Sequence, residues 1–163
     1  MVNVLFVCLG NICRSPMAEA LFRQQVKEAG LDRSIGVDSA GTGNWHVGDP
    51  PHSDTLAVLR KHGIAADGMR ARQLKPADLG EFDYLIVMDG SNLRDVEALA
   101  RRNGGSGNTK IVRLLDYADP VVALGEEDVP DPYYGGGFDH VYRLVESGCA
   151  GLLTEIVEEQ RLT

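Results

Sequence analysis

Residues 4–20, VLFVCLGNICRSPMAEA, contain the clearest structural pattern in the amino-terminal part of the chain. Residues 2–7 (VNVLFV) are apolar and rich in β-branched side chains, which is typical of a strand buried on both faces. A glycine-containing loop follows. Ser15 and Pro16 then open a helical stretch to about Ala29, and Gly30 marks its end. These residues predict a strand, a short loop and a helix.

The rest of the chain repeats the alternation of strands and helices. We expect further strands at residues 35–40, 82–88 and 110–114, and helices at residues 54–62, 91–102 and 137–160, with Gly148 as a candidate break in the last helix. Such alternation predicts a parallel sheet joined by right-handed crossovers. The 163 residues fit one domain, and no low-complexity linker divides them. The predicted fold is therefore a single α/β domain, residues 1–163, with a four-stranded parallel sheet and helices on both faces.

The overall charge and the cysteine count exclude several classes of protein. The formal net charge is −8, which argues against nucleic acid and anionic membranes as partners, because both require a basic face. No apolar run approaches the roughly 20 residues of a membrane helix. The three cysteines, an odd number, do not make a secreted disulfide framework. We expect a cytoplasmic protein that does not insert into a membrane.

The loop after the first strand has the composition of an anion-binding site. Backbone N–H groups converge in such a turn, and the first N–H groups of the following helix lack intrahelical partners. Gly10 permits a close backbone approach, and Asn11 tolerates a left-handed conformation. Arg14 adds a planar guanidinium group that can bind two phosphoryl oxygens. The same dipoles and charge favour the thiolate of Cys8, and the Ser15 hydroxyl can donate to it, so the loop predicts a nucleophilic cysteine inside a phosphate site.

Two distant segments carry residues that could complete this site. Asp131 lies between two prolines, which stiffen the loop and restrict the aspartate to extended conformations. A stiffly held carboxyl group suits proton transfer to a leaving group, although Asp-Pro is also a common turn. Trp45, the only tryptophan, lies in a glycine-rich loop, and Tyr133 and Tyr134 follow the acid. Aromatic side chains at these places either sandwich a phenyl ring or anchor their loops.

Several separate segments resemble, in the same order, those of the low molecular weight protein tyrosine phosphatases. Residues 4–20 resemble that family's signature. Residues 38–42 (DSAGT) with Trp45, residues 88–93 (MDGSNL) and residues 131–134 (DPYY) stand where the family has corresponding segments. The resemblance runs essentially end to end. It implies a four-stranded parallel sheet flanked by helices, and hydrolysis of phosphotyrosine proteins and small aryl phosphates without a cofactor.

The resemblance also implies a role for each residue of the site. Cys8 would be the nucleophile that forms a phospho-cysteine, Arg14 would clamp the phosphoryl group, and Asp131 would be the general acid and then the general base. The other residues would shape the phosphate-binding loop, support it or line the cleft: Leu9, Gly10, Asn11, Ile12, Cys13 and Ser15 in the loop, Ser39 in its support, and Trp45, Tyr133 and Tyr134 at the cleft.

The sequence departs from the family pattern at two support positions. Met69 stands where the family often has a histidine, and Gly90 stands where many relatives carry glutamate. We expect a slightly altered support for the loop and no loss of activity. No metal site is expected, because Cys8 and Cys13 lack a second pair of ligands. All four histidines are expected to be surface or packing residues: His46, His52, His62 and His140.

Two other activities of related proteins stay open at this stage. Relatives that act on phosphoarginine tend to carry threonine where this chain has Ile12, and they lack the tandem tyrosines. Arsenate reductases need additional cysteines in a mobile segment, whereas residues 80–92 contain none and Cys149 lies late in the last helix. We therefore expect phosphotyrosine as the substrate, phosphoarginine as the alternative, and a chain that acts as a monomer or weak dimer.

Overall fold

The computed structural model describes residues 1–162 and contains one four-stranded sheet in which all neighbouring strands are parallel. The strands follow the order β2-β1-β3-β4 across the sheet. Their bounds are β1 Val2–Cys8, β2 Ile35–Gly41, β3 Tyr84–Val87 and β4 Lys110–Arg113. The predicted α/β fold with a four-stranded parallel sheet is confirmed, and β1 lies between β2 and β3 at the centre of the sheet.

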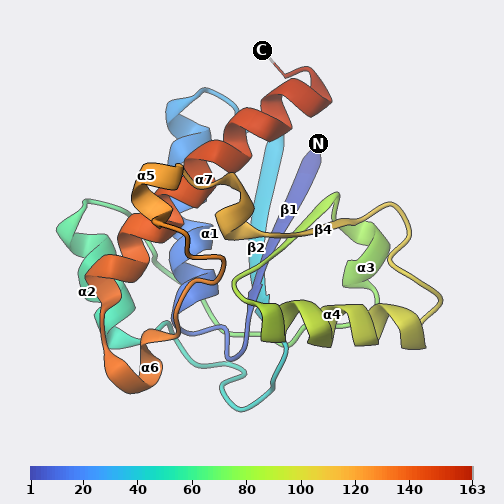
Figure 1. Cartoon of the computed structure of the whole chain (residues 1–163), viewed down its shortest axis with the longest axis horizontal. Coiled ribbons are helices and arrows are strands. Elements are labelled where there is room, and N and C mark those ends of the chain that lie inside the picture. Colours follow the sequence, from blue (N-terminus) through green and yellow to red (C-terminus); the bar gives the residue numbers. More distant parts are fainter. Residues whose placement is uncertain (163) are drawn as a thin grey trace.

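Helices cover both faces of this sheet, as predicted (Figure 1). The helices on one face are α1 Arg14–Glu28, α2 Ser53–Lys61 and α7 Phe138–Gln160, and those on the other are α3 Asp78–Glu81 and α4 Gly90–Arg102. Alternate residues of the central strands point to the two faces. Phe6 and Ile86 pack toward α1 and α7, where the Phe6 ring meets Phe22 edge-on at 5.4 Å, while Leu5 and Leu85 pack toward α4. Both faces of β1 and β3 are therefore covered, which explains why these strands are apolar apart from Asn3 near the start of β1.

The last helix runs without a break from Phe138 to Gln160, so the break proposed at Gly148 is wrong. The glycine serves packing instead. A Cβ atom at Gly148 would lie 2.6 Å from Leu114 Cγ, and one at Gly151 would lie 1.8 Å from the Tyr117 carbonyl oxygen. Leu114 and Tyr117 bound the 3₁₀ helix η1. The two glycines let α7 approach η1 closely enough to exclude any side chain between them.

Short elements that the sequence pattern does not predict join the main ones. These are α3, η1 Leu114–Tyr117, α5 Pro120–Ala123 and α6 Pro132–Gly135. The first long helix begins at Arg14, slightly before the predicted Ser15, and Gly30 follows its end with a φ of +74°. Among the described residues, no helix combines the length and the apolar character that a bilayer crossing requires.

Candidate active site

The loop between β1 and α1 is held against the ends of neighbouring elements. Asn11 has a φ of +58°, in the left-handed region that the sequence suggested. The N–H groups of Thr42 and Gly43, which follow β2, donate to the carbonyl oxygens of Cys8 and Leu9, each at 2.9 Å. A Cβ atom at Gly41 would lie 2.8 Å from the Leu9 oxygen. The loop therefore packs directly on the backbone of β2.

Buried side-chain hydrogen bonds support the loop from below. Asn11 Nδ2 donates to Ser15 Oγ at 2.8 Å and to Ser39 Oγ at 2.9 Å. Ser39 Oγ in turn donates to Glu19 Oε1 at 2.7 Å, and the Arg72 backbone N–H donates to Asn11 Oδ1 at 3.0 Å. The chain of bonds links the loop to α1, to β2 and to the segment before α3, so its shape depends on all three.

The hydroxyl of Ser15 lies 2.9 Å from the sulfur of Cys8. Because Ser15 Oγ already accepts a hydrogen bond from Asn11, its own hydrogen is available to the sulfur. The other acceptor near this hydroxyl, the Ala40 carbonyl oxygen, is more distant at 3.5 Å. The arrangement places a hydroxyl donor on the side of the sulfur that faces the protein interior.

Arg14 is almost completely buried, and two carboxylates and a carbonyl group orient its guanidinium group. Nη1 donates to Asp89 Oδ2 at 2.6 Å and to the Val129 carbonyl oxygen at 3.0 Å, and Nη2 lies 3.5 Å from Asp131 Oδ2. Burial lowers the Arg14 pKa, but the negative charges of Cys8, Asp89 and Asp131 outweigh this and hold the pKa above its ordinary value. Its Nε has no hydrogen-bond partner in the described protein, so this buried donor is free for an anion.

The neighbouring Cys13 has a different environment from Cys8. Burial, together with the negative charges of Cys8 and Asp131, raises the pKa of the Cys13 thiol to about 12. The Thr55 hydroxyl donates to the Cys13 carbonyl oxygen at 3.2 Å, which ties this end of the loop to α2. Cys13 is therefore a neutral thiol near pH 7.

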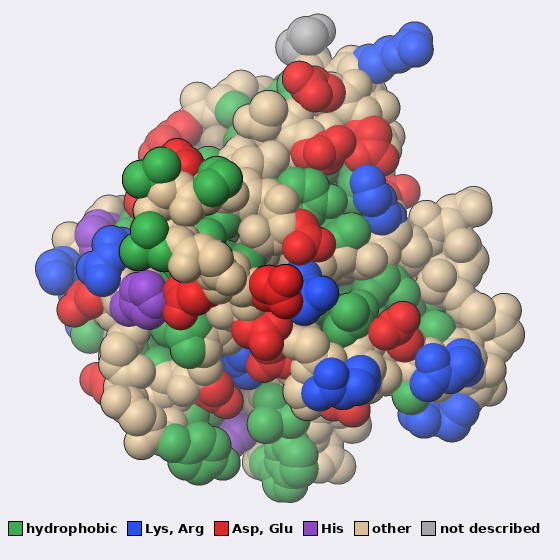
Figure 2. Space-filling view, in the orientation of Figure 1, with side chains coloured by type: hydrophobic (Ala, Val, Ile, Leu, Met, Phe, Trp, Pro, Cys, Tyr) green, Lys and Arg blue, Asp and Glu red, His purple; other side chains and the backbone are tan. Residues whose placement is uncertain are grey.

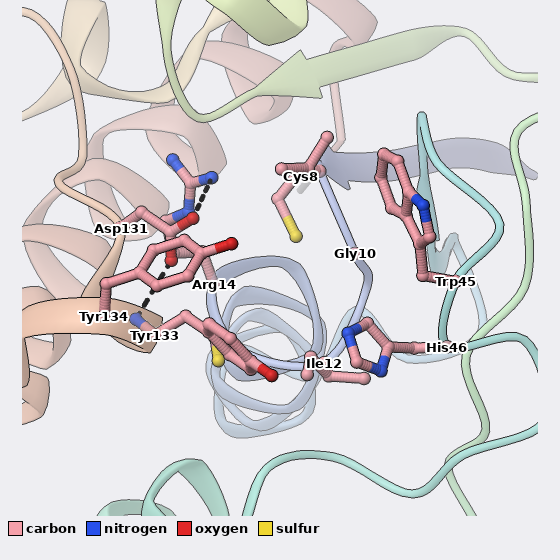
Figure 3. A pocket seen from close by; sticks show the side chains of 11 residues that line it. Cys8, Gly10, Ile12, Arg14, Trp45, His46, Asp131, Tyr133 and Tyr134 are labelled. Atoms are coloured by element: carbon pink, nitrogen blue, oxygen red, sulfur yellow. Dashed lines mark hydrogen bonds and ion pairs between the residues drawn. The ribbon is translucent and has the colours of Figure 1, made fainter.

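Most of the predicted site residues surround one cleft of about 250 Å³. Figure 3 shows Trp45 and His46 on one side of Cys8, and Asp131, Tyr133 and Tyr134 on the other. The predicted residues that line it are Cys8, Leu9, Gly10, Ile12, Cys13, Arg14, Trp45, Asp131, Tyr133 and Tyr134. The remaining three, Asn11, Ser15 and Ser39, lie in the supporting network.

The carboxyl group of Asp131 projects from the start of α6. Its backbone is extended, with φ of −83° and ψ of 112°, as expected before a proline. Oδ1 accepts a hydrogen bond from the Tyr133 N–H at 3.1 Å, which leaves Oδ2 toward Arg14 and the cleft. The two tyrosine rings that follow meet edge-on at 4.9 Å. One turn thus positions both the acid and an aromatic wall.

Three side chains that the sequence reasoning passed over contribute to the site. Glu19 accepts from Ser39, and its position one helical turn after Ser15 was a usable signal. Asp89 holds Arg14, and its place at the end of β3 also pointed toward the cleft. His46 was expected to be a surface or packing residue; its ring packs on Gly10, where a Cβ atom would lie 3.1 Å from His46 Cδ2, and it also lines the cleft. No sequence pattern marks His46.

The two departures from the family pattern lie outside the cleft lining. Met69 packs against the core cluster next to α1 and α7. Gly90 is the first residue of α4, and its N–H donates to Asp128 Oδ1 at 3.1 Å, so this aspartate joins the loop before Asp131 to α4. Asp128 is exposed, so this contact lies at the surface of the molecule.

A parallel α/β sheet whose central strand delivers a cysteine to an anion loop, beside a buried arginine and a loop aspartate, defines the class of cysteine-loop phosphatases. The comparisons give the family. Residues 3–162 match the family model for low molecular weight phosphotyrosine protein phosphatases, so the chain belongs to that family.

Curated relatives and solved structures agree with this assignment. The low molecular weight protein-tyrosine-phosphatase YfkJ of Bacillus subtilis is 49% identical over 162 residues, covering 99% of this chain and 100% of the relative. The crystal structure of YfkJ superposes with a TM-score of 0.90 and covers 98% and 97% of the two chains. The Drosophila arginine phosphatase structure is 35% identical, with a TM-score of 0.85 and coverage of 93% and 96%.

Proposed function

We propose that this protein-tyrosine phosphatase hydrolyses phosphotyrosine, and small aryl phosphates, through a phospho-cysteine intermediate on Cys8. The observation that carries the proposal is the convergence of Cys8, Arg14 and Asp131 on one cleft although the aspartate lies far along the sequence. The anion would be bound by the loop N–H groups and by Arg14, whose Nε is the buried donor without a protein partner.

In the first step the Cys8 thiolate attacks phosphorus while the bond from phosphorus to the tyrosyl oxygen breaks. Asp131, in its protonated form, gives its proton to the departing oxygen, so neutral tyrosine leaves. Its Oδ2 faces the cleft, since Oδ1 is held by the Tyr133 N–H. The Ser15 hydroxyl, 2.9 Å from the sulfur, stabilises the thiolate before attack.

In the second step water releases the phosphoryl group from the sulfur. Asp131, now a carboxylate, takes a proton from the water as its oxygen attacks phosphorus. The sulfur–phosphorus bond breaks, and its electron pair returns to Cys8 as a thiolate. Ser15 again donates to the sulfur as it leaves. The products are inorganic phosphate and the starting enzyme, with Asp131 protonated for the next cycle.

The walls of the cleft favour a flat aryl ester over a phosphorylated guanidinium group. Trp45 lies on one side of the entrance and the two tyrosines lie on the other (Figure 3). Aromatic pairs contribute about 0.5–1.5 kcal/mol beyond the area that they bury. The apolar Ile12 side chain offers no hydrogen bond to a guanidinium group. A phosphoarginine peptide is therefore expected to be the poorer substrate.

Hydrolysis of p-nitrophenyl phosphate by three variants, with EDTA and dithiothreitol present, tests the mechanism. Cys8→Ser should abolish turnover, and Asp131→Asn should slow it by roughly 10²–10⁴-fold. Glu127→Gln, in the same acidic loop and exposed, is the matched control and should behave as wild type. Turnover by Cys8→Ser at the wild-type rate would refute the nucleophile, and equal rates for Asp131→Asn and Glu127→Gln would refute the acid.

We also propose that the enzyme works in the cytoplasm, as a monomer or weak dimer that binds no nucleic acid. Three free, buried cysteines support a reducing compartment. The net charge of −8 supports the absence of nucleic acid from its partners. Light scattering at micromolar concentration, with and without an oligonucleotide, tests the last two points.

A further inference from the structure

A second groove, of about 320 Å³, shares Leu9 and Trp45 with the active-site cleft. These two side chains form a wall with one hollow on each side. The Trp45 ring is 70% exposed, yet its position is defined, because a Cβ atom at Gly43 would lie 1.9 Å from its Cζ3. The indole ring therefore rests flat on the glycine backbone, and the second groove begins where the cleft ends.

One face of α4 forms the floor of this groove. Asp95, Ala98, Leu99 and Arg102 all line it, and their spacing of three, four and seven residues places them on one side of the helix. The apolar Ala98 and Leu99 lie between the two charged residues, which stand about 10 Å apart at 1.5 Å per residue. The groove thus has an apolar middle, an acidic end and a basic end.

The basic end has no acidic partner in the described protein. Arg94, Arg101 and Arg102 of α4 make no ion pair among the residues described, although the chain as a whole carries a net charge of −8. Figure 2 shows Lys and Arg side chains gathered over α4, whereas acidic side chains dominate over the end of α7. An acidic group on a ligand would find its complement at this helix.

The groove also contains a polar atom without a partner. Thr42 Oγ1 is buried and makes no hydrogen bond in the described protein, and Thr42 lines the groove. Its backbone is fixed, since its N–H donates to the Cys8 oxygen and its carbonyl oxygen accepts from Gln73 Nε2. Because Oγ1 is covered in the free protein, a peptide group of a bound polypeptide would reach it only after the Thr42 side chain turned toward the groove.

We propose that the groove binds the segment of the substrate protein that flanks the phosphotyrosine. The cleft holds a single side chain, so the polypeptide must continue over its rim, and the wall of Leu9 and Trp45 leads into the groove. An apolar residue packs on Leu99, and an acidic residue pairs with Arg102. This inference rests on the proposed phosphotyrosine activity and adds a sequence preference to it.

Reversing the charge at position 102 of the enzyme and on the peptide tests whether Arg102, at the basic end of the groove, contacts the substrate. Two phosphotyrosine heptapeptides are compared, with leucine next to the phosphotyrosine on both sides and either glutamate or lysine in the second positions. Wild type should show the higher kcat/KM for the glutamate peptide. Arg102→Glu should shift this preference toward lysine by roughly two- to tenfold, because the lost attraction and the new repulsion each contribute on the scale of an exposed ion pair. Arg101→Glu is the matched control, since it makes the same charge change on the same turn outside the groove. If Arg102→Glu and Arg101→Glu change the peptide preference equally, the change arises from the net charge of the enzyme and not from the groove, and the proposal is overturned.

Filling the groove provides a second test that does not depend on charge. Ala98→Phe should lower kcat/KM for both peptides several-fold and leave p-nitrophenyl phosphate hydrolysis unchanged, whereas Glu97→Phe on the exposed side of α4 should change neither. Unchanged peptide kinetics in Ala98→Phe, or an equal loss with both substrate types, would overturn the subsite. A failure of the proposed phosphatase mechanism is distinguished from a failure of the subsite, because it would appear as hydrolysis of p-nitrophenyl phosphate by the Cys8→Ser variant.

Discussion

Replacing Asn11 with alanine tests how the phosphate-binding loop keeps its shape. The side chain donates to Ser15 and Ser39 and accepts from the Arg72 N–H, so the change removes three hydrogen bonds. At about 1 kcal/mol for each bond, the free energy of unfolding should fall by about 3 kcal/mol. Alanine at a φ of +58° costs about 1 kcal/mol more than asparagine or glycine, which adopt this conformation more readily, so we expect a total near 4 kcal/mol.

Asn11→Gly separates the two contributions. It removes the same three hydrogen bonds but accepts the left-handed backbone, so it should be about 1 kcal/mol more stable than Asn11→Ala. Urea unfolding of wild type and both variants gives these differences directly. In both variants the misplaced loop should lower kcat for p-nitrophenyl phosphate by at least about tenfold.

Two results would refute this reasoning. If both variants unfold within about 0.5 kcal/mol of wild type, the buried network does not stabilise the loop. If the alanine and glycine variants are equally stable, the left-handed backbone at position 11 carries no strain, and the loop relaxes when the side chain is removed.

Three further predictions concern other parts of the structure. Iodoacetamide should modify Cys8 and spare Cys13 between pH 6 and 9, as measured by peptide mass mapping. The reason is the Cys13 pKa of about 12, which leaves on the order of one Cys13 thiol in a thousand ionised at pH 9. Substantial early labelling of Cys13 would contradict it. Gly151→Ala should destabilise the protein by about 1–3 kcal/mol, measured by urea unfolding, since the new methyl group would meet the Tyr117 carbonyl oxygen. Asp89→Asn keeps a residue that can cap α4 but removes the charge beside the buried Arg14 guanidinium group. The free energy of unfolding should fall by about 2 kcal/mol in urea. An unchanged unfolding midpoint would refute this prediction.

The sequence predicts those parts of the fold that depend on local patterns. The apolar runs of β1 and β3 are visible without the structure, because strands buried on both faces carry few polar residues. The limits of α1 are visible from Pro16 near its start and Gly30 after its end. The left-handed backbone of Asn11 follows from its residue type and its place in a turn. These features are determined within a few residues of the chain.

Features that depend on distant contacts could not be predicted in this way. Glycine weakens a helix in any context, so Gly148 alone suggests a break. Only the close approach of Leu114 explains why a glycine stands inside the continuous helix α7. His46 lines the cleft because the loop after β2 folds over Gly10, and nothing in its neighbours marks that position. The pairing of Arg14 with Asp89 likewise arises only when β1 and β3 lie side by side.

The two carboxylate oxygens of Asp89 serve different parts of the molecule. Oδ1 accepts the Asn92 N–H at the start of α4, and Oδ2 accepts the Arg14 guanidinium group. The helix that forms the floor of the second groove and the arginine of the phosphate site thus share one anchor. Any displacement of α4 by a bound peptide would reach the guanidinium group through a single side chain. Coupling of this kind is reciprocal, so a phosphoryl group held by Arg14 would alter the affinity for the flanking peptide by the same factor.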